Sequence, residues 1–460
     1  MSRANWKGWA ICRPSLALAT LLFWPGPVVR AQNRATNEGT ATIIDLPTVL
    51  RLARAGNLEV SLAREGLADA RAAYQSTVLQ FLPWLSPGIS FRRHEHLIQD
   101  VSGNIIEANK QAYSPGAALT AQVDLGESVY RSLAARQDVR AAEQGLATQR
   151  QNSVQAAVAG YFDLLAAQAQ TGVSREAWRI AGELDRQLVH AVGAGLAYRG
   201  DELRARIQAG QAEQAVQRAV GAERIAGARL AERLHLDPAV ALTAADGDLV
   251  PLVLVPTNTA LAPMVAGALA RRPELRQSQA GLAAAEANRR GAAYGPLIPT
   301  VGGQAYFGGL GGGVDNGPSR FGQTEDFNAT LSWRIGPGGL FDPARKQRTR
   351  SREESARLAQ DRLRDQVIRE VVESLTRFRS LAEQLETARK TLAAAVEAEK
   401  LAGQRKEFAV GMVLETIQTQ QDLARARDSW VTLIAEFNKS QYELQRVAGV
   451  ELDAVAPTPR

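Results

Sequence analysis

Hydrophobic positions along the chain follow two different periods, and each period covers separate segments. In several long stretches the apolar residues recur every three or four positions, which is typical of helices that bury one face. The clearest stretches cover residues 45–82, 127–190, 201–236, 343–408 and 414–448. The second holds no proline, and roughly 60 residues at 1.5 Å each would form a rod of about 90 Å. We therefore predict helices much longer than those of a compact globular domain.

The helix predicted over residues 343–408 carries a continuous apolar seam. Its members fall at steps of three, four or seven: Leu363, Val367, Val371, Leu375, Phe378, Ala382, Leu385, Leu392 and Val396. A seam of this kind is typical of coiled-coil packing. Helices of this length hold too little core of their own, so they need partner helices along their whole length.

Four shorter segments alternate between apolar and polar residues, as strands do. The clearest is 327–335, which is apolar at every odd position and polar at every even one. The other three are 85–92, 119–125 and 301–307. Strands with one apolar and one polar side fit a wall between lipid and water, although a soluble sheet with one face on a core gives the same pattern. We expect the strands to form two pairs, joined by residues 97–111 and by the flexible, polar segment 308–325.

The chain repeats its organisation about 215 residues apart. Residues 46–83 and 261–299 both begin with a Leu/Ala-rich helical pattern, share an acid followed by an apolar residue, and end in an apolar residue plus proline. A shorter echo joins the segments that begin at Ala191 and Ala409. Solenoid repeats have periods of ~20 to 50 residues, so a period this long indicates a duplicated domain half.

This duplication divides the chain into expected domains. We place the first repeat at residues 32–245, with a β-hairpin at about 84–125, and the second at 261–449, with a β-hairpin at about 300–336. A linker of residues 246–260 separates the repeats, and a tail covers 450–460.

Residues 1–31 resemble a secretory signal peptide. Basic residues come first, then an apolar stretch from Leu16 to Trp24, then the small-residue cleavage site Val29-Arg30-Ala31. Its removal takes away four basic residues and no acidic one, which lowers the formal net charge from +6 to +2. The remaining charge gives no support for a nucleic-acid partner. A secreted chain with no other apolar run of 18 residues is periplasmic, released, or an outer-membrane β-barrel.

The sequence offers little for catalysis, cofactor or metal binding. The single cysteine, Cys12, lies in the signal before its apolar stretch, so we expect an unlipidated mature protein without thiol chemistry. His94 and His96 have no evident third ligand, and three methionines are too few for a soft-metal relay. The glycine run 308–313 opens no helix and lacks the lysine of a phosphate loop. We predict no enzyme, no cofactor and no metal site.

Four strands cannot close a barrel, which predicts an oligomer. An open strand edge in lipid would leave backbone groups unpaired at several kcal/mol each. Two copies would give eight strands, a barrel filled by its own side chains, whereas three would give twelve, wide enough for a lumen. We infer a trimeric duct that the long helices continue.

The chain resembles the TolC-like outer-membrane efflux proteins over nearly all of its mature length. The resemblance rests on the paired helix-to-strand segments that end at Pro83 and Pro299, and on the strand exit SWRIGPGGLFDPARKQR from Ser332. It also rests on the turn VGAGLAYRGDELRARIQ from Val192 and its partner VGMVLETIQTQQDL from Val410.

This resemblance implies an α+β membrane protein that forms a homotrimer. Each chain would give four strands to a 12-stranded β-barrel in outer-membrane lipid, continuous with a long periplasmic α-helical coiled-coil barrel. Residues 237–260 and the tail would contribute to a mixed equatorial girdle. Family members receive substrates from an inner-membrane pump or exporter through a periplasmic adaptor, without a chemical step.

The resemblance also indicates where function would lie. The glycine turns would form the periplasmic tip, where adaptor helices dock: Gly193, Gly195, Leu196, Gly411 and Met412. The same residues also suit plain helical hairpins, in which glycine closes the turn.

Three further residues fall where the family has its periplasmic entrance. Glu415 matches the first of two acids that ring the closed entrance, Gln418 replaces the second, and Asp201 takes the equivalent place in the first half. Replacement by glutamine puts a cation-binding constriction in doubt. Either acid could instead stabilise a helix N-terminus, an effect of ~0.3–1 kcal/mol.

The leading interpretation is the exit duct of a tripartite export system, most readily one for small molecules or drugs. Type I protein secretion is the alternative within the family. A periplasmic coiled-coil scaffold would not require the alternating strands, and a diffusion porin would need more strands per chain and no helical rods.

Overall fold

The structure, a computed structural model, describes residues 42–55, 57–245, 249–314, 320–407 and 413–450 of the 460-residue chain. Its helices are α1 (Leu46–Ala55), α2 (Leu58–Leu79), α3 (Leu125–Gly193), α4 (Arg199–Arg233), α5 (Leu261–Arg271), α6 (Pro273–Tyr294), the 3-10 helix η1 (Gly295–Leu297), α7 (Pro343–Glu407) and α8 (Val413–Val447). Its strands are β1 (Thr42–Ile44), β2 (Trp84–His94), β3 (Leu97–Gln99), β4 (Ile105–Glu107), β5 (Lys110–Asp124), β6 (Leu242–Ala244), β7 (Thr300–Val314) and β8 (Arg320–Ser332). None of the described helices is long and apolar enough to span a membrane.

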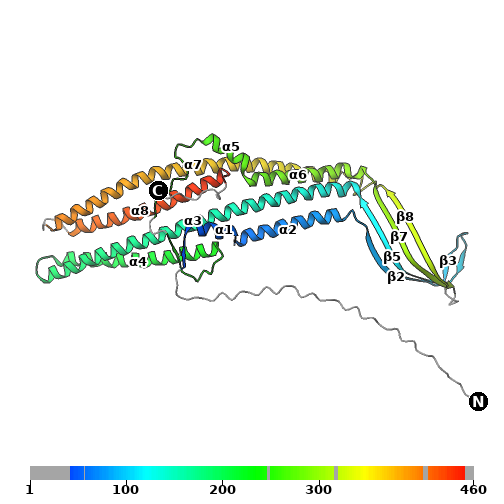
Figure 1. Ribbon diagram of the computed structural model, residues 1–460, viewed down its shortest axis with the longest axis horizontal. Helices are drawn as coiled ribbons and strands as arrows, with labels where there is room; N and C mark the ends of the chain where they lie inside the picture. Colours follow the sequence, from blue (N-terminus) through cyan, green and yellow to red (C-terminus); the bar gives the residue numbers. More distant parts are fainter. Residues whose placement is uncertain (1–41, 56, 246–248, 315–319, 408–412, 451–460) are drawn as a thin grey trace, which may run out of the picture. The chain divides into compact units, whose positions relative to one another are not determined.

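The long helices agree closely with the hydrophobic pattern. α3 has 69 residues and α7 has 65, so each is about 100 Å long at 1.5 Å per residue. The two repeats give the same order: two short helices, a strand pair and two long helices, with α4 and α8 each of 35 residues. In Figure 1 the long helices run side by side in antiparallel pairs, α3 with α4 and α7 with α8.

The prediction of a single helix over residues 45–82 is wrong, because the structure has two helices there, α1 and α2. Asn57 has extended backbone and is the N-cap of α2. Its Oδ1 accepts the N–H groups of Glu59 (2.8 Å) and Val60 (3.4 Å), which satisfies donors that a helix start leaves unpaired. The second repeat divides at the same place, where Arg272 precedes Pro273 at the start of α6.

The four long strands form one antiparallel sheet in the order β2-β5-β7-β8 (Figure 1). The central β5–β7 pair joins the two repeats. The expected second connection, 308–325, was too long, since β7 continues to Val314 and β8 begins at Arg320, whereas the expected first connection is close to the observed one between His94 and Lys110. Residues 308–325 are therefore mostly strand. In the other connection, 97–111, β3 and β4 pair as a small hairpin of their own.

Aromatic rings explain why a glycine-rich segment forms a regular strand here. A Cβ at Gly309 would collide with the Phe321 ring, and one at Gly311 with the Tyr113 ring. These two rings are stacked, with centroids 6.0 Å apart, across the glycines of β7. The glycines thus give room to cross-strand aromatic packing, which stabilises the sheet.

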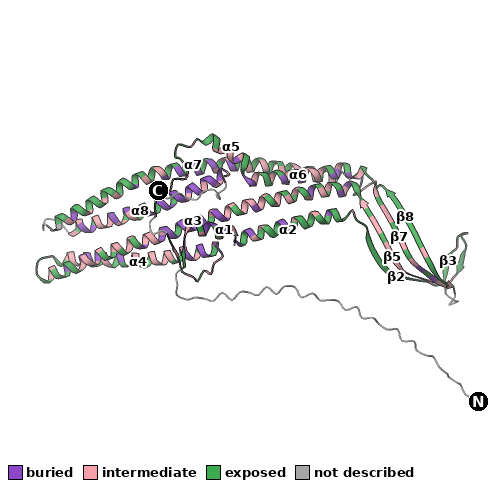
Figure 2. Cartoon of the chain, viewed as in Figure 1, coloured by how far each residue is buried: buried purple, intermediate pink, exposed green. Residues whose placement is uncertain are grey.

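One face of this sheet is mostly apolar and exposed in the single chain, and its polar members are Arg93, Gln111, Gln323 and Glu325. The register brings Leu85, Leu119, Ala305 and Phe327 into one row, and the face continues at every second residue. Its large side chains are exposed to between 41% and 80%: Leu85, Ile89, Phe91, Leu119, Val301, Phe307, Phe321, Phe327 and Leu331. The other face is mostly small or polar, with Trp84, Leu310 and Val314 as exceptions. Nothing in the described part of the chain covers the apolar face, as Figure 2 shows for the exposed strands β2 and β8.

The two outermost strands of the sheet, β2 and β8, each have one open edge. β2 pairs with β5 alone and β8 with β7 alone, so the outer edge of each is open in the chain as described. At the helical end of the sheet, Gly126 of α3 lies so close to η1 that a Cβ would be 2.8 Å from the Gly295 Cα. The strand predicted to continue to residue 335 ends at Ser332, and the Trp333 Nε1 donates a hydrogen bond to the Leu297 carbonyl (3.3 Å).

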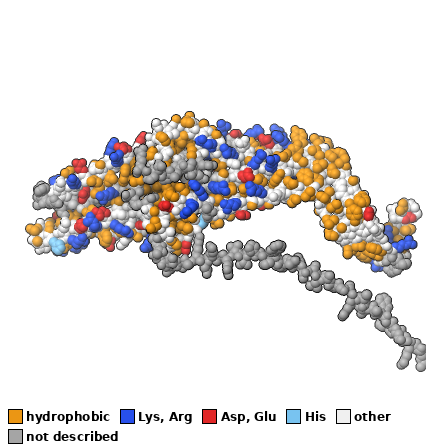
Figure 3. Space-filling model, in the orientation of Figure 1, with side chains coloured by type: hydrophobic (Ala, Val, Ile, Leu, Met, Phe, Trp, Pro, Cys, Tyr) orange, Lys and Arg blue, Asp and Glu red, His pale blue; other side chains and the backbone are white. Residues whose placement is uncertain are grey.

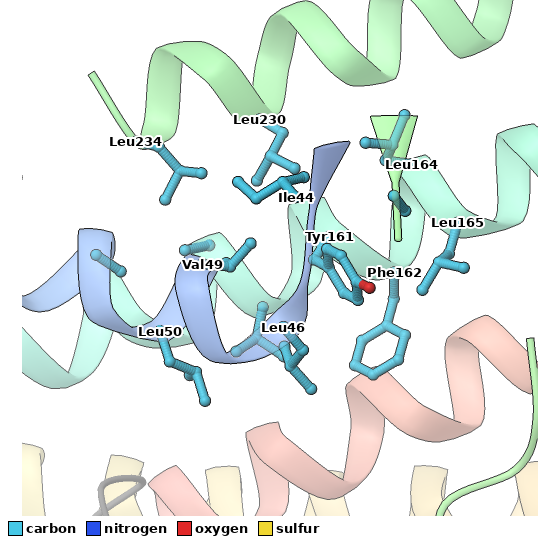
Figure 4. Packing of buried hydrophobic residues seen from close by; sticks show 14 of the residues in the cluster. Ile44, Leu46, Val49, Leu50, Tyr161, Phe162, Leu164, Leu165, Leu230 and Leu234 are labelled. Carbon is cyan, nitrogen blue, oxygen red and sulfur yellow. The ribbon is translucent and has the colours of Figure 1, made fainter. Parts of the chain in front are cut away.

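The main hydrophobic core lies where the short helices meet the long ones. Buried residues of α1, α3, α4 and α8 gather there with those of β1 and β6, which pair in parallel (Figure 4). Tyr161, Leu164 and Leu230 are buried completely. A second cluster joins α5, α7 and α8, and contains Val367, Val371, Leu375 and Phe378 of the predicted seam. The seam is thus buried in its middle, whereas Val396 near its end is 45% exposed.

A buried ion cluster holds the second repeat together. The Arg272 side chain, only 5% exposed, lies 3.2 Å from a Glu274 oxygen and 2.6 Å from a Glu370 oxygen. Burial opposes ionisation of Glu370, but hydrogen bonds from Gln366 and Arg272 prevail and hold its pKa below the ordinary value. The cluster links the start of α6 to the middle of α7.

Candidate functional site

The turn between α3 and α4 is closed by a glycine in the left-handed conformation. Gly195 has φ +73°, its N–H donates to the Val192 carbonyl (3.0 Å), and the Leu196 N–H donates to the Ala191 carbonyl (2.8 Å). These two bonds form a Schellman motif, which satisfies carbonyls that a helix end leaves unpaired. Gly193 is the last residue of α3, and a Cβ added there would meet no described atom within 4 Å.

The same turn presents apolar side chains to solvent. Leu196 is 84% exposed and Tyr198 is 75% exposed. Within the single chain they contribute little to the core, and such residues suit contact with another helix. Tyr198 was missed by the sequence analysis, although its place two residues after Leu196 in the turn was visible there.

The corresponding turn between α7 and α8 is only partly described. Gly411 and Met412 lie outside the described residues. The helices on either side, α7 to Glu407 and α8 from Val413, agree with the prediction.

A small hydrophobic cluster brings the ends of the two repeats together. Leu184 and Leu188 of α3, Ala205 of α4 and Ile417 of α8 are buried against one another. Ala197 and Val413 pack partly against them. The segments that the sequence assigned to one tip, 192–201 and 413–418, therefore meet in space. Ile417 was missed because its partners are more than 200 residues away in sequence.

Both predicted entrance acids form ion pairs with arginines. Glu415, in the first turn of α8, accepts a hydrogen bond from Arg405 Nη1 across the turn (2.8 Å). Asp201, in the first turn of α4, accepts one from Arg204 Nη1 (3.1 Å). The negative charge at each position is thus partly offset by a neighbouring positive charge. Gln418 is exposed one turn after Glu415.

The arginine partners differ in how far the sequence could indicate them. Asp201 and Arg204 are three residues apart on one helix, a spacing that predicts contact. Arg405 and Glu415 belong to different helices, so no spacing within one helix indicates their contact. All four side chains are at least 27% exposed, so the pairs contribute little to stability.

The described residues contain no group of three or more His, Cys, Asp or Glu side chains arranged to hold a metal ion. His94 and His96 do not share one site: His94 ends β2, and His96 has φ 74° in the following turn, 4.0 Å from a Glu107 oxygen.

Comparison with known proteins relates this arrangement to a family. Residues 265–450 match the family described as outer membrane efflux protein. No match was found among curated protein sequences.

Solved structures extend the similarity to nearly the whole chain. A membrane protein from Pseudomonas aeruginosa is 21% identical with a TM-score of 0.76, and covers 89% of this chain and 91% of its own. The CmeC outer membrane channel of Campylobacter jejuni is 16% identical with a TM-score of 0.77, over 88% of this chain and 85% of its own. The open state of the MtrE outer membrane channel of Neisseria gonorrhoeae is 17% identical with a TM-score of 0.69, over 88% of this chain and 89% of its own. These findings confirm the TolC-like fold and the resemblance to outer-membrane efflux proteins.

Proposed function

We propose that this chain, which has the fold of the TolC-like outer-membrane efflux proteins, is one of three identical subunits of an exit duct through the outer membrane. The sheet would give four strands to a 12-stranded barrel, and the long helices would continue the duct into the periplasm. An inner-membrane pump and a periplasmic adaptor would deliver the substrate. Family match and fold similarity support this proposal.

One observation carries the proposal. The sheet exposes a mostly apolar face, interrupted on β8 by Gln323 and Glu325, and has an open edge on both sides, at the end of helices about 100 Å long. A soluble scaffold would have to leave that face in water, at ~25 cal/mol for each Å² of apolar surface. Copies that pair edge to edge in lipid remove both costs. A closed ring also leaves the polar face around a lumen.

Trimer formation in a membrane is the first test. Purified protein in detergent should have the mass of three chains, and the protein should fractionate with the outer membrane. Mass spectrometry of that material should give a chain that begins after residue 31 and carries no acyl group. A monomer in the soluble fraction would refute the duct.

The exposed turn of α3 and α4 is the proposed adaptor-docking site. Gly195→Glu would place a bulky charge beside Leu196, while Gly195→Asn should keep the turn, because asparagine tolerates positive φ. Export should stop in the first variant and continue in the second, with trimers intact in both. Gly66→Glu on α2, another glycine with open space at the Cβ position, controls for the added charge. Normal export by Gly195→Glu would mean that the adaptor docks elsewhere. Gly411 and Met412 are proposed to act in the second turn in the same way.

We further propose small-molecule efflux as the task, with type I protein secretion as the alternative. The match to the outer membrane efflux protein family and the similarity to the CmeC and MtrE outer membrane channels support efflux. Deletion of the gene should raise intracellular accumulation of a dye or drug if efflux is correct. Loss of a secreted protein from the medium, with unchanged dye accumulation, would favour protein secretion.

A further inference from the structure

The end of the sheet far from the helices carries basic side chains on its polar face. The register places Arg92, Ala112, Gly312 and Arg320 in one row across all four strands. Lys110 lies two residues beyond Ala112 on β5, so its side chain points to the same side. This is the face of Ser86, Thr120 and Asn328, not the apolar face. We call Arg92, Lys110 and Arg320 the basic rim.

The basic rim has no acidic partner among the described residues. All three side chains are exposed. Of the nearby acids, Glu95 lies 2.6 Å from Arg93 and Glu107 lies 4.0 Å from His96, and neither forms an ion pair with a residue of the rim.

Acids on the polar face of the four strands are also distant. Only Asp326 and Asp124 occupy that face within the strands as described. Asp326 is six residues from Arg320 along β8, which corresponds to about 20 Å at ~3.3 Å per residue. That separation is more than twice the Debye length of ~8 Å at physiological salt, so Asp326 does not neutralise the rim. Figure 3 shows the contrast between the hydrophobic side chains over the strands and the charged ones beyond them.

We propose that the basic rim makes the outer mouth of the duct selective for anionic solutes. This inference rests on the proposed function, in which the polar face lines the lumen and three copies surround it. Nine cationic groups would then face one aperture. Rings of arginine and lysine attract anions and phosphates in pores, and converging charge of one sign raises the local concentration of oppositely charged solutes. The fitting cargo carries carboxylate, phosphate or sulfonate groups.

Placement on the polar face separates this proposal from ordinary surface charge. Basic groups that merely contact lipopolysaccharide would be expected on the apolar, lipid-facing side. On that side the outer end has Arg93, and its charge is paired with Glu95. A test in bilayers without lipopolysaccharide excludes that source of negative charge altogether.

The experiment uses the purified trimer in planar bilayers of zwitterionic phosphatidylcholine. Tripolyphosphate added to the outer side should block the current of the wild-type channel. In the variant Arg92→Gln/Lys110→Gln/Arg320→Gln the concentration for half block should rise about tenfold, because the anion loses the attraction of the cationic groups around the mouth. The reversal potential in a KCl gradient should also move away from the chloride value.

Two controls keep the result specific. Arg93→Gln/Glu95→Gln neutralises an ion pair at the same end but on the other face, and should leave the block unchanged. Block by hexaamminecobalt from the periplasmic side should be equal in wild type and triple variant, because it does not depend on the outer mouth.

Each outcome decides the matter. A conducting wild-type channel that tripolyphosphate does not block, or blocks as well after the triple substitution, overturns this inference and leaves the duct in place. A soluble monomer in place of the membrane-bound trimer would overturn the proposed function, and the inference with it.

Discussion

Two buried amides of α8 hold the chain between the repeats, and their removal gives the sharpest test of the packing argument. Asn438 Oδ1 accepts the Leu252 N–H (2.8 Å) and its Nδ2 donates to the Val250 carbonyl (2.9 Å). Gln441 Oε1 accepts the N–H groups of Leu254 (2.7 Å) and Val255 (3.3 Å), and its Nε2 donates to the Leu252 carbonyl (2.9 Å). Both side chains are fully buried.

The number of bonds sets the expected size of the effect. A hydrogen bond of this kind contributes about 1 kcal/mol net, so Asn438→Ala should lower the free energy of local opening by ~2 kcal/mol and Gln441→Ala by ~3 kcal/mol. At 1.4 kcal/mol for each factor of ten, amide-hydrogen protection of residues 249–255 should fall about 30-fold in the first variant and about 100-fold in the second.

Hydrogen exchange measured by mass spectrometry on the intact trimer reads this out without global unfolding. Gln445→Ala, on the next turn of α8, is the matched control because no described hydrogen bond joins its side chain to this segment. Leu252 and Leu254 also pack against the main core. If exchange of the segment were the same in Asn438→Ala as in wild type, those apolar contacts would hold it and our hydrogen-bond account would be refuted.

Three further predictions concern the junction with the sheet, the ion cluster and the entrance. Gly126→Ala should overpack the junction at a cost of ~1–3 kcal/mol and so lower the temperature at which the trimer dissociates. Gly66→Ala, in an open helical position, should not lower it. Gel electrophoresis of heated samples compares the two variants. Because the folded pKa of Glu370 lies below the ordinary 4.5, its contribution to stability is present above that pH and is lost as pH falls through the folded pKa; melting curves of Glu370→Gln should therefore depend less on pH in the acid range. Arg405→Gln should free the Glu415 carboxylate and strengthen channel block by multivalent cations. Glu415→Gln should abolish this stronger block. Equal block in the wild type and in both variants would show that this pair does not act at the entrance.

Much of the fold was predictable because its elements are long and strongly periodic. The 3.6-residue seam of Val367, Val371 and Leu375 and the two-residue alternation of 327–331 each follow from one apolar side of the element. Where the prediction failed, a contact distant in sequence decided the structure. The glycines of β7 suggested a flexible segment, whereas Tyr113 and Phe321 pack over them.

The candidate site was predictable to a different degree. Glycine at a helix end identified Gly195, because its positive φ has a local cause. The acids at Glu415 and Asp201 were found by resemblance, but their pairing with Arg405 and Arg204 limits the charge they present. The cross-turn partner Arg405 lies ten residues from Glu415, and no helical spacing could have paired them.

The two repeats share the backbone of one joint but differ in its side-chain chemistry. Asn57 and Arg272 lie 215 residues apart at the same position, the N-cap of α2 and of α6. Asn57 caps the helix itself, and its Nδ2 donates to the Arg233 carbonyl at the end of α4 (3.2 Å). Arg272 makes no side-chain cap and instead binds Glu370 of α7. Each side chain is nearly buried and ties the start of a short helix to a long one. The backbone of the joint is extended in both repeats while its side-chain chemistry differs, because a neutral amide and a paired guanidinium can each remain hydrogen-bonded when buried.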